Sequence, residues 1–133
     1  MDANNKLRVL VADDCKDTAD STALLIDLWG HKVQVAYDGE GALAAARAFQ
    51  PDVLLLDIGM PKMDGCHLAQ AIRQQAKEDC VLIALSGFSD EQHRRLAQEA
   101  GFDAYFSKPV DPLELKAILS GQNGPARLKP MHA

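Results

Sequence analysis

The sequence predicts an α/β domain with a flavodoxin-like, doubly wound fold: a five-stranded parallel sheet in the order 2-1-3-4-5, with five helices. Short apolar runs alternate with amphipathic segments along the chain, as in consecutive βα units. The run Val53–Leu56 is continuously apolar, which is typical of a parallel strand that is buried on both faces. Asp57 follows this run directly, and the ligand crevice of such a sheet lies at the carboxyl ends of its strands.

The predicted strands and helices alternate along the chain. Strands are predicted at residues 7–12, 32–36, 53–57, 81–85 and 103–107. Apolar residues at helical spacing predict the buried faces of the first four helices. These residues are Ala19, Ala23, Ile26 and Trp29; Ala42, Leu43 and Ala46; Leu68, Ala71 and Ile72; and Leu96, Ala97 and Ala100. A fifth helix is predicted to run through Leu119.

Several helix boundaries are marked by residues that commonly cap helices. Gly30 and Gly101 can adopt the left-handed conformation that often ends a helix. Asp38 is expected to cap the start of the second helix, and residues 89–92 form a capping box for the fourth. The fifth helix is expected to begin at Asp111-Pro112, because proline suits the first helical position.

The 133-residue composition, 47% hydrophobic with a net charge of -5, fits one domain. The domain is expected at residues 7–120, with an N-terminal extension at 1–6 and a flexible tail at 121–133. The acidic balance without a basic run argues against direct binding of nucleic acid. No membrane insertion is expected, because the apolar runs are too short to span a bilayer. The four histidines are expected at the surface. A polar N-terminus and unpaired cysteines predict the cytoplasm.

Polar residues follow the ends of four predicted strands, and they are Asp13, Asp14, Asp57, Ser86 and Lys108. Strands 1 and 3 are neighbours in the predicted order, so three carboxylates would crowd together and require a cation. Carboxylate oxygens without a His or Cys cluster favour Mg²⁺. A carboxylate beside Mg²⁺, an ammonium and a hydroxyl is arranged to attack phosphorus. The expected chemistry is therefore the formation of an aspartyl phosphate.

With these residues in this order, the chain resembles the receiver domains of two-component response regulators over about residues 7–120. The resemblance implies that Asp57 accepts the phosphoryl group, that Ser86 senses it and that Lys108 is its charge partner. The implied Mg²⁺ ligands are Asp13, Asp14, Asp57 and the backbone carbonyl of Gly59. The phosphoryl group would come from a histidine kinase or a histidine phosphotransfer protein.

The resemblance also implies how the domain would signal. Tyr105 matches the aromatic residue that moves with the hydroxyl of Ser86, and the surface of helix 4, strand 5 and helix 5 would switch. Output would pass to a phosphorylation-dependent protein partner or a homodimer. Pro109 is expected to follow a cis peptide bond. Gly59 and Phe88 flank the path of the hydrolytic water in the family, and neither can orient it, so slow phosphate loss is expected.

The domain is expected to be a signalling module, not an enzyme, although the parent would be a kinase if the domain came from a hybrid histidine kinase. Two alternatives remain. An aspartate-nucleophile phosphohydrolase usually has a second aspartate two residues after the nucleophile, where this chain has Gly59. A binding-only module of flavodoxin type would carry a phosphate loop after the first strand, and a degenerate receiver would lack an acid; neither feature is present.

Overall fold

The computed structural model describes residues 6–58, 65–76, 79–87, 95, 97–108 and 110–119, except for the side chain of Cys66. Its strands are β1 (Arg8–Ala12), β2 (Lys32–Ala36), β3 (Val53–Asp57), β4 (Val81–Ser86) and β5 (Ala104–Ser107). Its helices are α1 (Lys16–Leu28), α2 (Gly39–Phe49), α3 (Gly65–Gln75) and α5 (Pro112–Leu119). Residues 95 and 97–99, between β4 and β5, are also helical.

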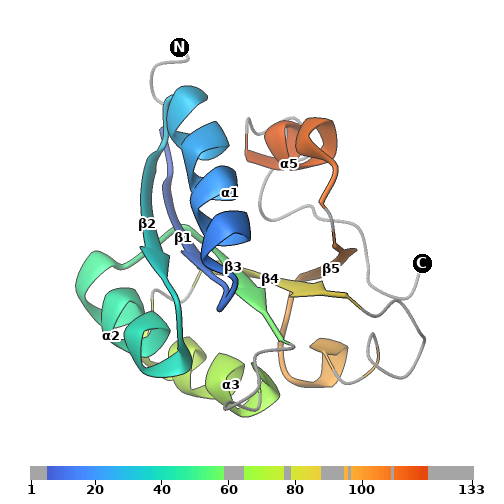
Figure 1. The fold of residues 1–133 in the computed structure, drawn as a ribbon. Helices are drawn as coiled ribbons and strands as arrows, with labels where there is room; N and C mark the ends of the chain where they lie inside the picture. The colour runs from blue at the N-terminus through green and yellow to red at the C-terminus, as the bar shows by residue number, and fades with distance from the viewer. Residues whose placement is uncertain are drawn as a thin grey trace.

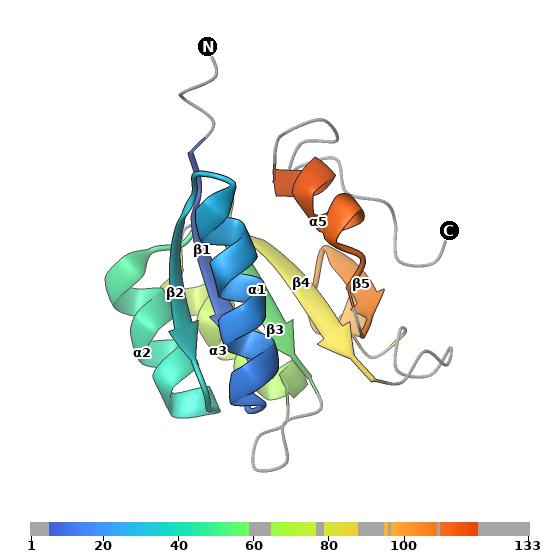
Figure 2. The same ribbon diagram turned by 45° about the horizontal axis from the view of Figure 1, so that its top comes forward.

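The five strands form one parallel sheet in the order β2-β1-β3-β4-β5, which confirms the predicted fold. Helices α1 and α5 cover one face of the sheet, and α2 and α3 cover the other (Figure 1). The arrowheads of the strands all point to the same edge in the turned view (Figure 2). The residues that follow the strands are therefore gathered along this carboxyl edge.

Strand burial follows strand position. Every residue of β3 and β4 is buried, because these strands lie inside the sheet and are covered on both faces. Edge strand β2 instead exposes Lys32 and Gln34 and buries only Ala36 fully. Register places Val9, Val53 and Val81 side by side on the α1 and α5 face. The neighbouring residues in each strand face α2 and α3, so the two apolar cores are separated by the sheet.

The predicted helix boundaries are largely confirmed. Gly30 and Gly101 have φ of 97° and 99°, a backbone conformation that glycine adopts without strain. The Asp38 carboxylate accepts a hydrogen bond of 2.7 Å from the N–H of Gly41 at the start of α2. Asp111 accepts one of 2.9 Å from the N–H of Leu113, and Pro112 is the first residue of α5. The predicted capping box at 89–92 and Leu96 lie outside the described residues.

Four expectations about burial need correction. Trp29 is only half-buried, because it follows α1 as its C-cap residue at the margin of the core. Ala69 of α3 is fully buried and Ala71 is only half-buried, because the core-facing side of α3 passes through Leu68, Ala69 and Ile72. Leu43 is half-buried at the margin of the α2 core. His31 is 7% exposed, so it is not a surface histidine, and its Nδ1 accepts the N–H of Leu7 at 3.0 Å.

Within the described residues, no helix is both long and apolar enough to cross a lipid bilayer.

Candidate functional site

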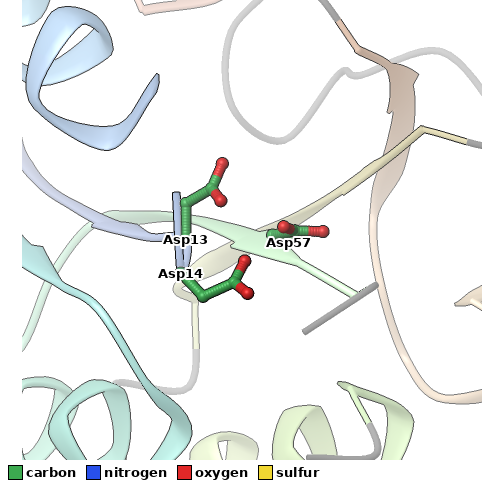
Figure 3. A group of neighbouring side chains, drawn as sticks. All are labelled: Asp13, Asp14 and Asp57. Atoms are coloured by element: carbon green, nitrogen blue, oxygen red, sulfur yellow. The ribbon is translucent and has the colours of Figure 1, made fainter. Parts of the chain in front are cut away.

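Three carboxylates meet at the carboxyl edge of the sheet. Asp13 and Asp14 extend from the end of β1 toward Asp57, the last residue of β3 (Figure 3). One carboxylate oxygen from each residue lies within 4.8 Å of the others. Strands β1 and β3 are neighbours, so the parallel register alone brings these chain segments together. The predicted crowding of acids at this edge is therefore present.

Lys108 supplies the opposite charge. Its Nζ lies 2.9 Å from Oδ2 of Asp13 and donates a hydrogen bond of 3.2 Å to Oδ2 of Asp57. Desolvation by itself lowers the pKa of Lys108, but the close contact with Asp13 and the charges of both acids outweigh it and raise that pKa. The backbone N–H of Lys108 donates a 2.8 Å hydrogen bond to the carbonyl of Ser86. This bond fixes the backbone position from which the Lys108 side chain extends toward the acids. One ammonium thus bridges two acids from different strands.

The Asp57 carboxylate is less accessible than the sequence suggests. A strand-terminal aspartate before a loop is expected to face solvent, yet the side chain of Asp57 is only 8% exposed. The Lys108 side chain lies against it and is itself 23% exposed. The nucleophilic group expected from the sequence is consequently partly desolvated, which strengthens any charge interaction made there.

Asp13 is held by contacts of both its backbone and its side chain. It is fully buried, its N–H donates to the carbonyl of Ala36 at 3.1 Å, and its Oδ1 accepts the N–H of Cys15 at 3.0 Å. Among the described residues, its Oδ2 receives no hydrogen bond of suitable geometry, although Lys108 faces it at ion-pair distance. A buried carboxylate oxygen that faces one ammonium, beside two further carboxylates, fits a hard cation such as Mg²⁺.

Ser86 and Tyr105 lie in adjacent strands. Ser86 ends β4 and is fully buried, and it pairs with Ser107 of β5. Tyr105 is half-buried and pairs with Ala84, so alternation places the side chains of Ser86 and Tyr105 on the same face of the sheet. This is the face covered by α2 and α3, where Tyr105 packs against the apolar core. Gly59, Phe88 and Pro109 lie outside the described residues.

Sequence reasoning did not find Tyr37 or the groove beside Lys108. Tyr37 follows β2 directly, and this strand-terminal position was the only signal in the sequence. Its hydroxyl donates a 2.6 Å hydrogen bond to Asp20 of α1. The groove has a volume of about 310 Å³ and lies between α1 and the start of α5. Thr18, Ser21 and Thr22 line its polar side.

Residues 9–120 match the family model of the response regulator receiver domain. The chain belongs to this family. Response regulator receiver domains act in two-component signalling, so the strand-terminal acids belong to a signalling module. The family match covers every described strand and helix except Arg8, the first residue of β1.

The receiver domain is similar to proteins of two different lengths. It is 38% identical over 111 residues to an uncharacterized 14.6 kDa protein in the sodA1 3′ region of Leptolyngbya boryana, covering 83% of this chain and 85% of that protein. It is 34% identical over 110 residues to the alkaline phosphatase synthesis transcriptional regulatory protein PhoP of Bacillus subtilis. That match covers 83% of this chain but 45% of PhoP, so the chain spans about half of the longer relative.

The fold is similar to a CheY-like response regulator receiver domain protein from Methanospirillum hungatei JF-1. The TM-score is 0.77 at 28% sequence identity, and the match covers 83% of this chain and 87% of the other. A doubly wound sheet of this order is thus shared with a solved receiver domain.

Proposed function

We propose that this receiver domain is a phosphoacceptor, which takes a phosphoryl group from a phosphohistidine onto Asp57 in the presence of Mg²⁺. One observation carries the proposal: three carboxylates lie within 4.8 Å, and the Lys108 ammonium contacts two of them. Like charges this close repel one another strongly, so the arrangement needs cations. Phosphoryl transfer brings a dianionic group to such a site and needs the same positive charge.

In the proposed reaction, a carboxylate oxygen of Asp57 attacks phosphorus and the P–N bond of the phosphohistidine breaks. The electron pair of that bond stays on the imidazole nitrogen, which takes up a proton from solvent. The product is an acyl phosphate on Asp57 and a neutral histidine on the donor. Lys108 favours the ionised, nucleophilic form of Asp57 before transfer and offsets the negative charge of the phosphoryl group afterwards.

The residues expected to hold Mg²⁺ are Asp13, Asp14, Asp57 and the backbone carbonyl of Gly59. Mg²⁺ bound by these residues would supply positive charge that stabilises the transferred phosphoryl group. The side chains of the domain would hold the ion and limit the access of water. Asp13 is buried and held by three contacts, so it provides a rigid ligand, whereas the exposed Asp14 lies at the open side of the site. The low exposure of Asp57 limits the approach of bulk water to the nucleophile.

The proposed switch consists of Ser86 and Tyr105 and acts on the surface of β5, α5 and the fourth helix, whose described residues are 95 and 97–99. The two residues lie in adjacent strands on one face of the sheet. A phosphoryl group on Asp57 would attract the hydroxyl of Ser86, and Tyr105 would then occupy the space that Ser86 leaves. Phosphate would shift the population between two arrangements of one surface. Ser86→Ala should therefore weaken the phosphate dependence of partner affinity.

The lifetime of the phosphoryl group is proposed to be long, because neither Gly59 nor Phe88 can orient a hydrolytic water. Replacing both, Gly59→Asn with Phe88→Glu, should speed decay of the phosphorylated protein by roughly tenfold, which corresponds to about 1.4 kcal/mol of barrier. Decay would be followed in Mg²⁺ after removal of the donor. Equal decay in parent and double variant would mean that other groups control the water.

The proposal also covers the partners, the bounds and the cellular location of the domain. A histidine kinase or histidine phosphotransfer protein would be the donor, and a phosphorylation-dependent protein partner or a homodimer would receive the signal. The receiver domain would occupy residues 7–120, with 1–6 as an extension and 121–133 as a flexible tail. It would work in the cytoplasm, without contacting nucleic acid directly, and Pro109 would follow a cis peptide bond. The domain would catalyse only its own phosphorylation and dephosphorylation.

The test is incubation with Mg²⁺ and acetyl phosphate, followed by measurement of the intact mass. One stable added phosphoryl group on the parent, and none on Asp57→Asn, supports the phosphoacceptor. Asp13, Asp14 and Asp57 together form the acidic group. Asp79→Asn, a change in an exposed acid outside this group, serves as the matched control and should be modified like the parent. Steady consumption of the donor without added mass supports a phosphohydrolase instead. No modification and no turnover supports a binding-only domain.

A further inference from the structure

A second group of side chains lies beside the acidic group and plays no part in the reaction described above. The hydroxyl of Tyr37 donates a 2.6 Å hydrogen bond to Oδ1 of Asp20, in the second turn of α1. The Nζ atom of Lys16, the first residue of α1, lies 5.1 Å from the centre of the Tyr37 ring. Tyr37 thus contacts two successive turns of α1 through two kinds of interaction, a charge-assisted hydrogen bond and a cation–π contact.

The backbone beside Tyr37 contacts the loop that carries the acids. Tyr37 follows Ala36, whose carbonyl accepts the N–H of Asp13 at 3.1 Å. Residues 13–15 connect β1 to α1, and Asp14 lies in the middle of this short loop. The end of β2 therefore holds both ends of the loop: the backbone of Ala36 at Asp13, and the side chain of Tyr37 at Lys16 and Asp20.

The start of α1 has no side-chain cap, although Oδ1 of Asp13 accepts the N–H of Cys15 just before it. Cys15 occupies the N-cap position, and its side chain makes no capping hydrogen bond. A helix start without a side-chain cap leaves N–H groups unsatisfied and frays more readily. The contacts of Tyr37 compensate for this, because they attach the first two turns of α1 to the sheet.

Asp14 depends most on this attachment. Asp13 and Asp57 are buried and share the Lys108 ammonium, so burial and charge hold them in place. Asp14 is exposed, so its position relies on the backbone that carries it. The other two carboxylates repel it, and a mobile loop would let it move away from the group.

We propose that Tyr37 is a positioning residue for the acidic group: by holding the first two turns of α1 it keeps Asp14 beside Asp13 and Asp57, where a divalent cation binds. The inference rests on the proposed function for its second readout, the Mg²⁺ concentration for half-maximal phosphorylation, but not for its first, the affinity for Mg²⁺. The hydrogen bond to Asp20 is the main cause that raises the pKa of Tyr37, so the hydroxyl remains a donor throughout the neutral range.

The experiment compares the parent chain with Tyr37→Phe, which keeps the ring beside Lys16 and removes only the hydroxyl. Affinity for Mg²⁺ is measured without a phosphodonor, from the unfolding midpoint at increasing Mg²⁺ concentration. Loss of one hydrogen bond that holds a ligand in place should weaken Mg²⁺ binding roughly threefold to tenfold. The Mg²⁺ concentration for half-maximal phosphorylation by acetyl phosphate should rise by the same factor. The limiting rate at saturating Mg²⁺ should stay within about twofold, because cation binding restores the position of Asp14.

Two further variants test whether the effect passes through Asp20. Asp20→Ala should weaken Mg²⁺ binding as Tyr37→Phe does, and the double variant should be no weaker than either single one, because both remove the same contact. Asp20→Asn keeps an oxygen acceptor and should recover most of the affinity. Arg47→Met is the matched control, since it removes an exposed hydrogen bond of 3.0 Å, to Gln75, between α2 and α3. It should leave Mg²⁺ affinity unchanged.

Each result either supports or overturns the positioning role of Tyr37. Unchanged Mg²⁺ affinity in Tyr37→Phe overturns the inference, even if the variant is less stable, because a purely structural contact would change stability alone. Additive losses in the double variant overturn the role of Asp20. If the parent binds Mg²⁺ but is never phosphorylated, the proposed function fails while the positioning role is still judged by the Mg²⁺ titration. A parent that does not bind Mg²⁺ overturns both.

Discussion

Charged side chains are matched differently at the amino edge of the sheet, where the strands begin, and at the carboxyl edge, where they end. At the amino edge, acids are matched by donors: Oδ2 of Asp52 accepts the N–H of Arg8 at 2.8 Å, and Oδ2 of Asp103 accepts the N–H of Leu82 at 2.9 Å. Arg73 adds an ion pair of 2.8 Å with Asp103 and hydrogen bonds to the carbonyls of Cys80 and Gly101. At the carboxyl edge, three carboxylates meet one ammonium.

This difference in charge matching suggests that the amino edge contributes mainly to stability, whereas the carboxyl edge carries the proposed functional site. The amino edge connects α3, β4 and the segment before β5 through polar contacts that leave little charge unmatched. At the carboxyl edge three carboxylates contact one ammonium, an excess of negative charge that should lower stability without metal and favour a bound cation. Strained or repulsive groups persist at functional sites when the surrounding structure holds them. Substitutions at the two edges should therefore have different effects, and four of them test this.

The largest effect on stability is expected from removing Lys108, the cation that contacts both Asp13 and Asp57. Lys108→Met leaves the buried Asp13 and Asp57 without their shared partner, and it should lower the free energy of unfolding by about 3 kcal/mol at neutral pH without metal. Mg²⁺ should raise the unfolding midpoint of this variant more than that of the parent, because the ion then replaces the positive charge that Lys108 supplied. Urea unfolding with and without Mg²⁺ measures both. Lys32→Met, an exposed change in β2, is the control and should alter stability by less than about 0.5 kcal/mol.

At the amino edge, removing an acid should destabilise the fold without affecting the chemistry. Asp103→Ala removes the ion pair with Arg73 and leaves the N–H of Leu82 without its acceptor, at a cost of about 1–2 kcal/mol. Denaturant unfolding measures the loss. Phosphorylation by acetyl phosphate below the unfolding transition should proceed at the parent rate. A slower rate would show that the two edges are coupled, contrary to the comparison.

At the carboxyl edge, removing an acid should have the opposite sign. Asp14→Asn relieves repulsion by the other two carboxylates and should raise the metal-free unfolding midpoint by a few degrees, from about 0.5–1 kcal/mol. The same variant should bind Mg²⁺ more weakly. Thermal unfolding in a chelator, then in Mg²⁺, measures both effects. A lower metal-free midpoint would mean that the acids are better compensated than their distances indicate.

The smallest effect concerns His31, near the amino edge between β1 and β2. Its buried ring accepts the N–H of Leu7 through Nδ1, and burial lowers the pKa of His31 below its ordinary value of 6.5. The unfolded chain therefore binds a proton at a higher pH than the folded chain does. Stability should fall as the pH decreases below about 6.5 and level off below the folded-state pKa. In His31→Gln this part of the pH dependence should disappear; an unchanged profile in urea unfolding would assign it to other groups.

Much of the fold could be predicted because its signals are local. The predicted bounds of β2 and β3 match the structure, since apolar runs and the residues that end them identify buried strands directly. The glycines after α1 and at Gly101 were predicted as helix ends on conformational grounds that need no tertiary information. The choice between Ala69 and Ala71 could not be made this way. Both are small and apolar, and packing against α2 decides which one faces the core.

The sequence by itself determined which residues reach the carboxyl edge, because the end of a parallel strand is visible in the order of apolar and polar residues. Only the tertiary structure decided how their charges are arranged. It places Lys108 between Asp13 and Asp57, leaves Asp14 exposed, and brings Tyr37 onto α1. These distances depend on how the fold brings together segments that are far apart in the chain. Coulombic energy varies with such distances and with the burial of the charged side chains, and the local pattern of residues specifies neither for these charges.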